Sequence, residues 1–320
     1  MAEQVLIGAE QMADLDRTLA PLAGPGPVVD LLFDNHWNDD SAAPGILSAA
    51  LMGTLAEREL LIDVVDEEAS EKLLQFGVAS ALWRRPAQLT SFTDKAHALN
   101  HSALGAVWTI GDIAAGQALF ADSPTPSSAF GPTHATFVNP HLSSGDDGYP
   151  DVLYLVGRWL FNRFERFGES GEQMVGAVEK ILGELVSNVH EHAGSVEHPR
   201  IDSLVRIGID AEAIRCTVSD NGIGICESLR PKLDEDHLEH PATSQELLNG
   251  LLAGELRRWH HGRGVGLGRV LQIARRRAGK VNVATRTNRS VVESAVPTTS
   301  VADLDLQGTV VDVVLPLPSA

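Results

Sequence analysis

Short apolar runs alternate with segments of helical period along the N-terminal part of the chain. Residues 27–35 (PVVDLLFDN) and 60–66 (LLIDVVD) are rich in aliphatic side chains and predict buried strands. Residues 44–58 and 67–76 carry apolar side chains at helical spacing, and Gly77 follows the second of them. Strand, helix, strand and helix in this order predict a small α/β domain.

The pattern is sharper in the C-terminal half of the chain. An amphipathic helix is predicted from residue 151, and a second helix over about 172–193. Two alternating runs, 203–209 and 213–219, are separated by a short polar turn and predict a β-hairpin. A further helix is predicted at about 266–277. Three more strands are predicted near residues 280–286, 291–296 and 309–315.

The middle of the chain shows no clean period. Within it, residues 121–149 are rich in Ser, Pro, Gly and Asp, a composition typical of a loop or linker. A chain of 320 residues is long enough for two hydrophobic cores. We therefore expect an N-terminal α/β domain over 1–90, an irregular connector over 91–150 and a second domain over 151–320.

Composition narrows the class of protein. The formal net charge of −18 repels nucleic-acid phosphates, so nucleic acid is not an expected partner, and any anionic ligand needs locally supplied positive charge. The two cysteines, Cys216 and Cys226, are too few for a disulfide framework. The N-terminus lacks the basic and apolar regions of a signal peptide, and no apolar stretch is long enough to span a membrane. We expect a cytoplasmic protein without a membrane partner.

The first candidate motif lies on the helix predicted at 172–193. Glu184, Asn188 and His192 are spaced at i, i+4 and i+8, so they share one helix face. The amide oxygen of Asn188 is a hard ligand of the kind Mg²⁺ prefers, and the carboxylate of Glu184 could act as a general base toward a water. The alternative is that these side chains form an ordinary solvated helix face.

The second candidate motif follows the strand predicted at 213–219. Asp220 stands at the strand end, and Gly222 and Gly224 come directly after it. A carboxylate in this place can accept a hydrogen bond from the exocyclic amine of adenine, and glycines allow the backbone to approach a base closely. The alternative is a simple turn, because Asp-Asn-Gly is strong turn chemistry.

The third candidate motif is a glycine-rich loop that opens the helix predicted at 266–277. Gly264, Gly266 and Gly268 place backbone N–H groups at a helix N-terminus, which favours anions such as phosphate. The loop does not follow a strand, so a dinucleotide-binding fingerprint is excluded. Basic side chains precede it: Arg257, Arg258, His260, His261 and Arg263. A fourth element, Gly308 and Thr309, precedes the last strand and by itself indicates only a turn.

The order and spacing of these four elements resemble the N, G1, G2 and G3 boxes of the GHKL superfamily, which includes gyrase, HSP90, histidine kinases and MutL. The resemblance covers residues 151–320. It implies a Bergerat-fold α/β sandwich, in which helices cover one face of a mixed sheet. It also implies that Asn188 binds Mg²⁺, that Asp220 reads the adenine of ATP, and that 226–261 forms an ATP lid. The further residues implied in the site are Gly222 and Gly224 at the base, Arg263, Gly264, Gly266 and Gly268 at the phosphates, and Thr309 near the adenine.

Within the superfamily, the Glu-x-x-x-Asn-x-x-x-His spacing is most similar to that of the anti-sigma serine kinases, which implies that Glu184 is the catalytic base. Sensor histidine kinases carry a phospho-acceptor His followed by an acid in a helical hairpin. No such box precedes Glu184, since no acid directly follows His97 or His101. We therefore do not expect a conventional autophosphorylating histidine kinase.

The N-terminal α/β pattern resembles, more weakly, the STAS domain of anti-anti-sigma factors. The likeness lies in VVDLLFDN, in Ser41 before a helix opened by Gly45, in LLIDVVD and in EKLLQFGV. It implies that Ser41 could be phosphorylated, although Pro44 departs from the family pattern. The alternative is that Ser41 is an ordinary residue before a helix.

These observations predict a regulatory protein that binds ATP and Mg²⁺ and acts as an ATPase or as a serine/threonine protein kinase. A STAS-like module would regulate the catalytic domain, and the partner would be another regulatory protein. An ATP-gated dimeric clamp of the HSP90 or MutL kind and a non-catalytic nucleotide sensor are the alternatives. The sequence leaves open whether ATP is hydrolysed or used to phosphorylate a protein, and whether the chain forms a homodimer.

Overall fold

The structure is a computed structural model of the chain. It describes residues 3–23, 26, 28–35, 42–84, 87–96, 107–109, 118–121, 134–138, 152–194, 201–235, 239, 241–255, 266–293 and 296–318. Ser41, His97, His101, Arg263 and Gly264 lie outside these residues.

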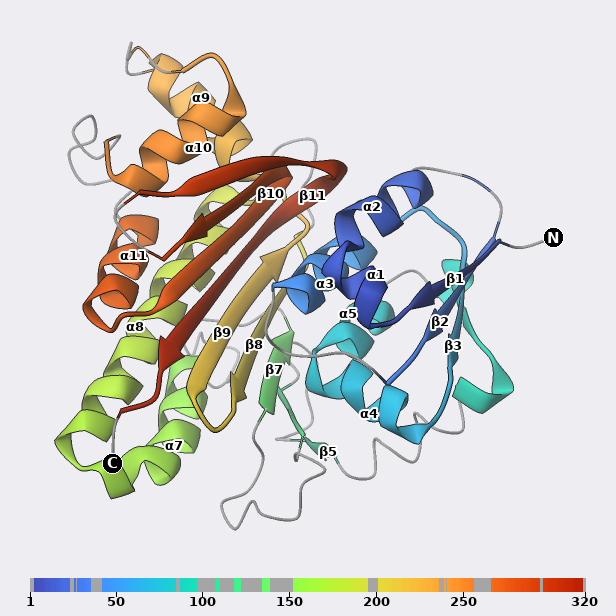
Figure 1. The fold of residues 1–320 in the computed structure, drawn as a ribbon, viewed down its shortest axis with the longest axis horizontal. Coiled ribbons are helices and arrows are strands. Elements are labelled where there is room, and N and C mark those ends of the chain that lie inside the picture. The colour runs from blue at the N-terminus through green and yellow to red at the C-terminus, as the bar shows by residue number, and fades with distance from the viewer. Residues whose placement is uncertain are drawn as a thin grey trace, which may run out of the picture.

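The N-terminal part is built on a four-stranded parallel sheet with the order β1-β2-β3-β4 (Figure 1). Its strands are β1 (Glu3–Ile7), β2 (Val29–Phe33), β3 (Leu60–Val64) and β4 (Thr90–Phe92). The helices between them are α1 (Ala9–Ala13), α2 (Leu15–Leu19), η1 (Ala20–Leu22), α3 (Ala43–Met52), α4 (Glu67–Gln75), α5 (Val78–Arg84) and η2 (Ala87–Leu89). The α/β pattern predicted here is confirmed, with α3 ending earlier than expected. The STAS likeness stays a prediction.

The C-terminal part is an α/β sandwich, as the sequence predicts. Its helices are α7 (Val152–Phe164), η3 (Glu165–Phe167), α8 (Glu169–His192), α9 (Ile225–Glu235), α10 (Ser244–Ala253) and α11 (Gly266–Arg276). Its strands include β8 (Ser203–Ile209), β9 (Ala213–Asp220), β10 (Lys280–Val292) and β11 (Thr298–Pro316). The separate strand expected near 291–296 is wrong, because β10 runs on to Val292 and β11 begins at Thr298.

The stretch 91–150, expected to be an irregular connector, contains short strands. Three of its segments, β5 (Val107–Thr109), β6 (Ala118–Ala121) and β7 (His134–Val138), join the C-terminal sheet in the order β10-β11-β9-β8-β7-β6-β5. These strands have three to five residues, too few to show a period among Ser, Pro and Gly. All six pairings in this sheet are antiparallel, whereas the resemblance implied a mixed sheet. The domain limits themselves stay a prediction.

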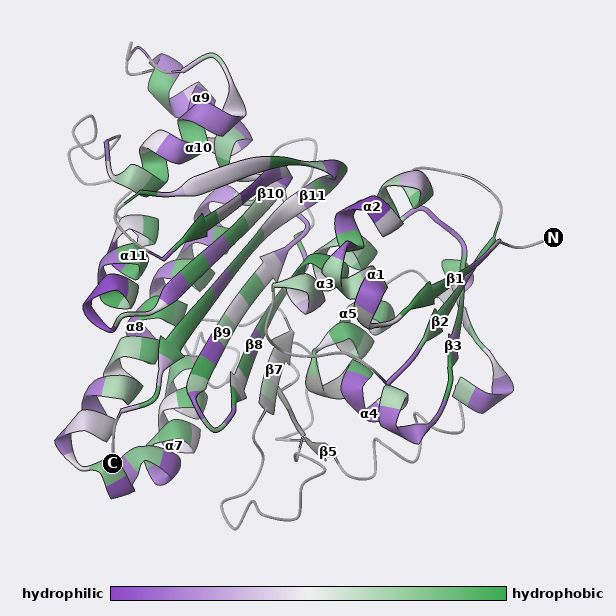
Figure 2. Ribbon diagram, viewed as in Figure 1, coloured by the Kyte–Doolittle hydropathy of each residue, from purple (hydrophilic) through white to green (hydrophobic). Residues whose placement is uncertain are grey.

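The two faces of the seven-stranded sheet pack against different helical layers. Cys216 and Val218 of β9 face the core shared with α7, α8, α10 and α11. Leu204 of β8 and Val310 of β11 face the core shared with α2, α3 and α5. Helices α2, α3 and α5 of the N-terminal part thus lie between the two sheets (Figure 1). Hydrophilic and hydrophobic bands follow each other along β9 (Figure 2), as expected for a strand with two distinct faces.

The two parts of the chain meet closely at α3. A Cβ on Gly45 would lie 2.7 Å from Cγ2 of Thr217 and 2.8 Å from Cγ1 of Val310, so only glycine allows the helix this near the sheet. The hydroxyl of Ser219 also donates a hydrogen bond to the carbonyl of Gly45, at 3.3 Å. One buried core therefore extends from the N-terminal sheet to the C-terminal sheet. Among the described residues, no helix combines the length and the apolar composition that a membrane crossing requires.

Candidate nucleotide-binding site

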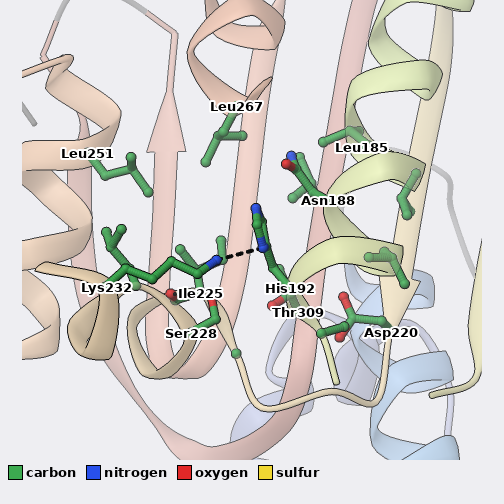
Figure 3. A pocket seen from close by; sticks show the side chains of 16 residues that line it. Leu185, Asn188, His192, Asp220, Ile225, Ser228, Lys232, Leu251, Leu267 and Thr309 are labelled. Carbon is green, nitrogen blue, oxygen red and sulfur yellow. Dashed lines mark hydrogen bonds between the residues drawn. The ribbon is translucent and has the colours of Figure 1, made fainter. Parts of the chain in front are cut away.

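A cavity of about 130 Å³ lies beside α8, bounded by α9, α10, α11, the end of β9 and the middle of β11 (Figure 3). Apolar side chains make up most of its wall: Leu185, Val189, Val218, Ile225, Leu229, Leu251, Leu267 and Val311. Six polar side chains line it: Asn188, His192, Asp220, Ser228, Lys232 and Thr309. An apolar wall with a few convergent polar groups is typical of a small-molecule site.

Asp220 ends β9 at this cavity, where the sequence predicts the adenine-reading residue. Its side chain is buried, and its Oδ1 accepts a hydrogen bond from the backbone N–H of Gly222 at 2.8 Å. Burial raises the pKa of Asp220 to about 7, although hydrogen bonds from the backbone of Gly222 and Thr309 oppose the shift. A buried carboxylate at the edge of an apolar cavity can accept a hydrogen bond from a ligand amine.

The glycines after Asp220 allow the loop its path. A Cβ on Gly222 would lie 2.4 Å from the carbonyl oxygen of Ala193, at the end of α8. Gly224 has φ +95°, a conformation that favours glycine, and it lines the cavity. Both glycines predicted in this motif are therefore required by the geometry of the loop.

Thr309 lies directly opposite Asp220, because the two residues are register partners between β11 and β9. Gly308, just before it, has φ +111°, and a Cβ there would overlap the carbonyl oxygen of Asp220. The structure thus brings the second and fourth predicted motifs together at one edge of the cavity.

The first and third motifs also meet. A Cβ on Gly266, the first residue of α11, would lie 3.0 Å from Oε2 of Glu184 and 3.0 Å from Oδ1 of Asn188. Gly268 is buried within the first turn of α11. The helix N-terminus, a favourable place for phosphate, therefore faces the amide and the carboxylate of α8. Arg263 and Gly264 lie outside the described residues.

Glu184 has a partner that the sequence does not predict. Nη1 of Arg269, on α11, lies 2.7 Å from Oε1 of Glu184, and the Arg269 side chain is 61% exposed. Arg269 is thus a cation paired with the carboxylate that lies against Gly266, where phosphate charge is expected. Its position one residue after a glycine-rich loop was the available signal, but the contact with Glu184 depends on how α8 and α11 pack.

Lys232 is a second site residue that sequence reasoning missed. Its Nζ lies 2.7 Å from Nδ1 of His192, so the pair spans the cavity from α9 to α8 (Figure 3).

The segment 226–261 shows no clear period in sequence, yet it contains α10 and nearly all of α9. These helices bury leucines of the C-terminal core, including Leu233, Leu247 and Leu252.

The donor set near Asn188 fits Mg²⁺ held chiefly through a nucleotide. Among the described residues, no three His, Cys, Asp or Glu side chains lie close enough to bind a metal by themselves. Mg²⁺ is commonly held by one or two protein oxygens together with substrate phosphates and waters. Asn188 Oδ1, which lies against the start of α11, is an oxygen of this kind.

Comparison with known proteins agrees with this geometry. Residues 175–319 match the family model "Histidine kinase-, DNA gyrase B-, and HSP90-like ATPase", and this range contains all four motifs. Residues 175–319 are therefore similar to GHKL-type ATPase domains, a class that implies ATP binding.

A solved structure that matches is the "Histidine kinase domain from Erythrobacter litoralis EL346 blue-light activated histidine kinase". It is 17% identical, with a TM-score of 0.27, and the match covers 56% of this chain and 66% of that chain. The chain thus spans just under two thirds of that domain's length. No curated protein matches the chain.

Proposed function

We propose that this protein binds ATP with Mg²⁺ in the cavity beside α8 and transfers the γ-phosphoryl group to water or to a serine or threonine of a regulatory partner. The observation that carries the proposal is the meeting of the four motifs. Asp220 and Thr309 stand together at one edge of the cavity, and Gly266 lies against Glu184 and Asn188.

The proposal gives each polar group a role. The Asp220 carboxylate accepts a hydrogen bond from the adenine amine, while the apolar wall covers the base. Lys232 and Arg269 supply positive charge that the chain as a whole lacks. Asn188 Oδ1 holds Mg²⁺, which would neutralise charge that develops on the phosphates.

Glu184 is the proposed general base. It takes the proton from the attacking hydroxyl while that oxygen bonds to the γ-phosphorus and the bond to the β–γ bridging oxygen breaks, releasing ADP. Glu184 forms an ion pair with Arg269 in the structure. We expect Arg269 to turn toward the phosphates, which frees the carboxylate for the proton.

The biological setting is also part of the proposal. The likeness to anti-sigma kinases and to STAS domains favours a cytoplasmic switch with a regulatory protein partner, and Ser41, Arg263 and Gly264 keep their expected roles. An HSP90- or MutL-like clamp and a nucleotide sensor without catalysis remain the alternatives.

One labelling experiment tests this function. The full chain is incubated with Mg²⁺ and ATP labelled at the γ-phosphate, alone and with cell lysate. Label released as inorganic phosphate indicates hydrolysis, and label on a lysate protein indicates a kinase. Glu184→Gln should bind ATP and lose either activity by roughly 10²–10⁴-fold. Glu172→Gln, an exposed residue of the same helix, is the matched control.

The outcomes separate the alternatives. ATP binding without transfer to water or protein would favour the nucleotide sensor. Failure of the wild-type chain to bind ATP in a calorimeter would contradict the proposal altogether.

A further inference from the structure

The end of helix α3 lies directly behind the loop that carries Asp220. The amide Nδ2 of Asn221 donates a hydrogen bond to the carbonyl of Met52 at 3.2 Å. The Oδ1 of the same side chain accepts from the backbone N–H of Asp202 at 2.8 Å. Asn221, the residue after Asp220, is therefore held to the last residue of α3 on one side and to the start of β8 on the other.

Thr54 fastens the opposite side of the same site. Its hydroxyl accepts a hydrogen bond from the backbone N–H of Gln307 at 2.7 Å and donates one to the carbonyl of Asp305 at 3.1 Å. Gln307 also reaches Asn221, with Nε2 lying 3.4 Å from its carbonyl oxygen. Gln307 stands two residues before Thr309, so the strand that presents Thr309 is held by a hydroxyl of the N-terminal part.

Steric fit at this contact is close. A Cβ on Gly53 would lie 2.7 Å from the carbonyl oxygen of Gln307, so the turn after α3 rests on the β11 backbone. Gly308 in turn rests on Asp220, since a Cβ there would overlap the Asp220 carbonyl. Backbone in contact with backbone leaves little room for adjustment, so a displacement of α3 would be passed on to Asp220 and Thr309.

We propose that the Met52–Thr54 turn of the N-terminal part is a positioning element for the adenine-reading pair Asp220 and Thr309. This inference rests on the proposed function, because it assumes that the pair contacts adenine. Thr54 is then a positioning residue that acts through Gln307 and Asn221 without touching the nucleotide. A ligand or partner that moves α3 would change ATP affinity, and by linkage ATP would stabilise this position of α3.

The test uses the full-length chain and Thr54→Val, which removes the hydroxyl while keeping the shape of the side chain. We expect MgATP affinity, measured by calorimetry, to fall about three- to tenfold, as for one or two lost hydrogen bonds. Weak MgGTP binding should change less, so the preference for ATP over GTP narrows. Thr54→Ser should restore the preference. Thr18→Val is the matched control, because that hydroxyl bonds only within its own helical turn, to the carbonyl of Asp14.

A purely structural role of Thr54 would lower the melting temperature and leave the ATP-to-GTP preference unchanged, and this result would overturn the inference. Failure of the wild-type chain to bind MgATP would instead contradict the proposed function.

Hydrogen exchange on the wild-type chain is a second test, and it needs no variant. We expect MgATP to slow exchange at residues 53–56 and not at residues 15–19, and equal exchange with and without MgATP would contradict the coupling.

Discussion

The two faces of the seven-stranded sheet are both buried, but they are built from different side chains. The face toward α7, α8 and α11 is almost wholly aliphatic, with residues such as Ile207, Val218 and Val313. The face toward α3 carries a polar network among its apolar residues. Asp312 accepts hydrogen bonds from Arg215 at 2.7 Å, Thr217 at 2.8 Å and Asn282 at 2.8 Å.

This difference shows how a sequence pattern can hide a domain contact. Alternation of apolar and polar residues, as in Ile214 to Ser219, is typical of a sheet with one face in water. Here the polar residues are buried as well: Arg215 is 8% exposed, and Asp312 is fully buried. Helix α3 of the N-terminal part packs on this face at Thr217 and Ser219, so the polar face serves as an interface within the chain.

The largest expected effect comes from breaking the polar network. Asp312→Ala removes the carboxylate and leaves the Arg215 guanidinium buried without this partner, which should lower the free energy of unfolding by about 3–5 kcal/mol. Asp305→Ala is the control, since its ion pair with Arg286 is partly exposed and should contribute about 1 kcal/mol or less. Urea denaturation of both variants measures the difference. Equal losses would mean that the polar face behaves as a solvated surface.

A smaller effect is expected from opening the contact between α3 and the sheet. Gly45→Ala introduces a methyl group within 2.8 Å of Thr217 and Val310, and overpacking of this kind costs about 1–3 kcal/mol. Gly176→Ala in α8 is the matched control. A Cβ there meets nothing within 4 Å, so the helix should gain stability by roughly 0.5–1 kcal/mol. Thermal unfolding should show opposite shifts, and a stabilised Gly45→Ala variant would contradict the close packing.

The same contrast explains which parts of the fold could be predicted. The hairpin at 203–209 and 213–219 and the helices α8 and α11 have strong periods, and the structure confirms them. The strands β5 to β7 could not be found, because each is short and is defined by its neighbour in the sheet rather than by its own residues. The cover over the polar face could not be predicted either, since it depends on glycine at position 45.

The residues of the candidate site likewise divide into those that could be predicted from the sequence and those that could not. Asp220, Gly222 and Gly224 could be predicted because they belong to a local motif of strand end and turn. Gly308 and Thr309 were expected just before a strand, whereas both lie within β11. Lys232 could not be predicted, since its role depends on α9 lying across from His192. Arg269 was missed for the same reason, because only the packing of α11 on α8 brings it to Glu184. Contacts between motifs are set by tertiary packing, which spacing along the chain does not encode.

The smallest expected effect is the pH dependence of ligand binding at Asp220. Burial raises the pKa of Asp220 to about 7 from its ordinary value of 3.8, so its ionised fraction should rise from about one tenth at pH 6 to about nine tenths at pH 8. An adenine amine is held by the ionised form, so affinity should rise about tenfold over this range. Adenosine is the ligand to titrate, because it has no phosphate whose own ionisation would contribute. His192→Gln should keep the dependence, which would exclude titration of that imidazole as its cause.

Stability should respond to pH with the opposite sign. Because the folded state holds the Asp220 proton more tightly than the unfolded state, this stabilising contribution is complete below about pH 4 and is lost as pH rises through about 7. Asp220→Asn cannot ionise, so its melting temperature relative to wild type should be higher at pH 8 than at pH 5, by a few degrees, while adenosine binding is lost. If Asp220→Asn gives the same difference at pH 5 and pH 8, Asp220 is already ionised in the free protein, and the buried carboxyl at the nucleotide edge is not held near neutrality by its apolar surroundings.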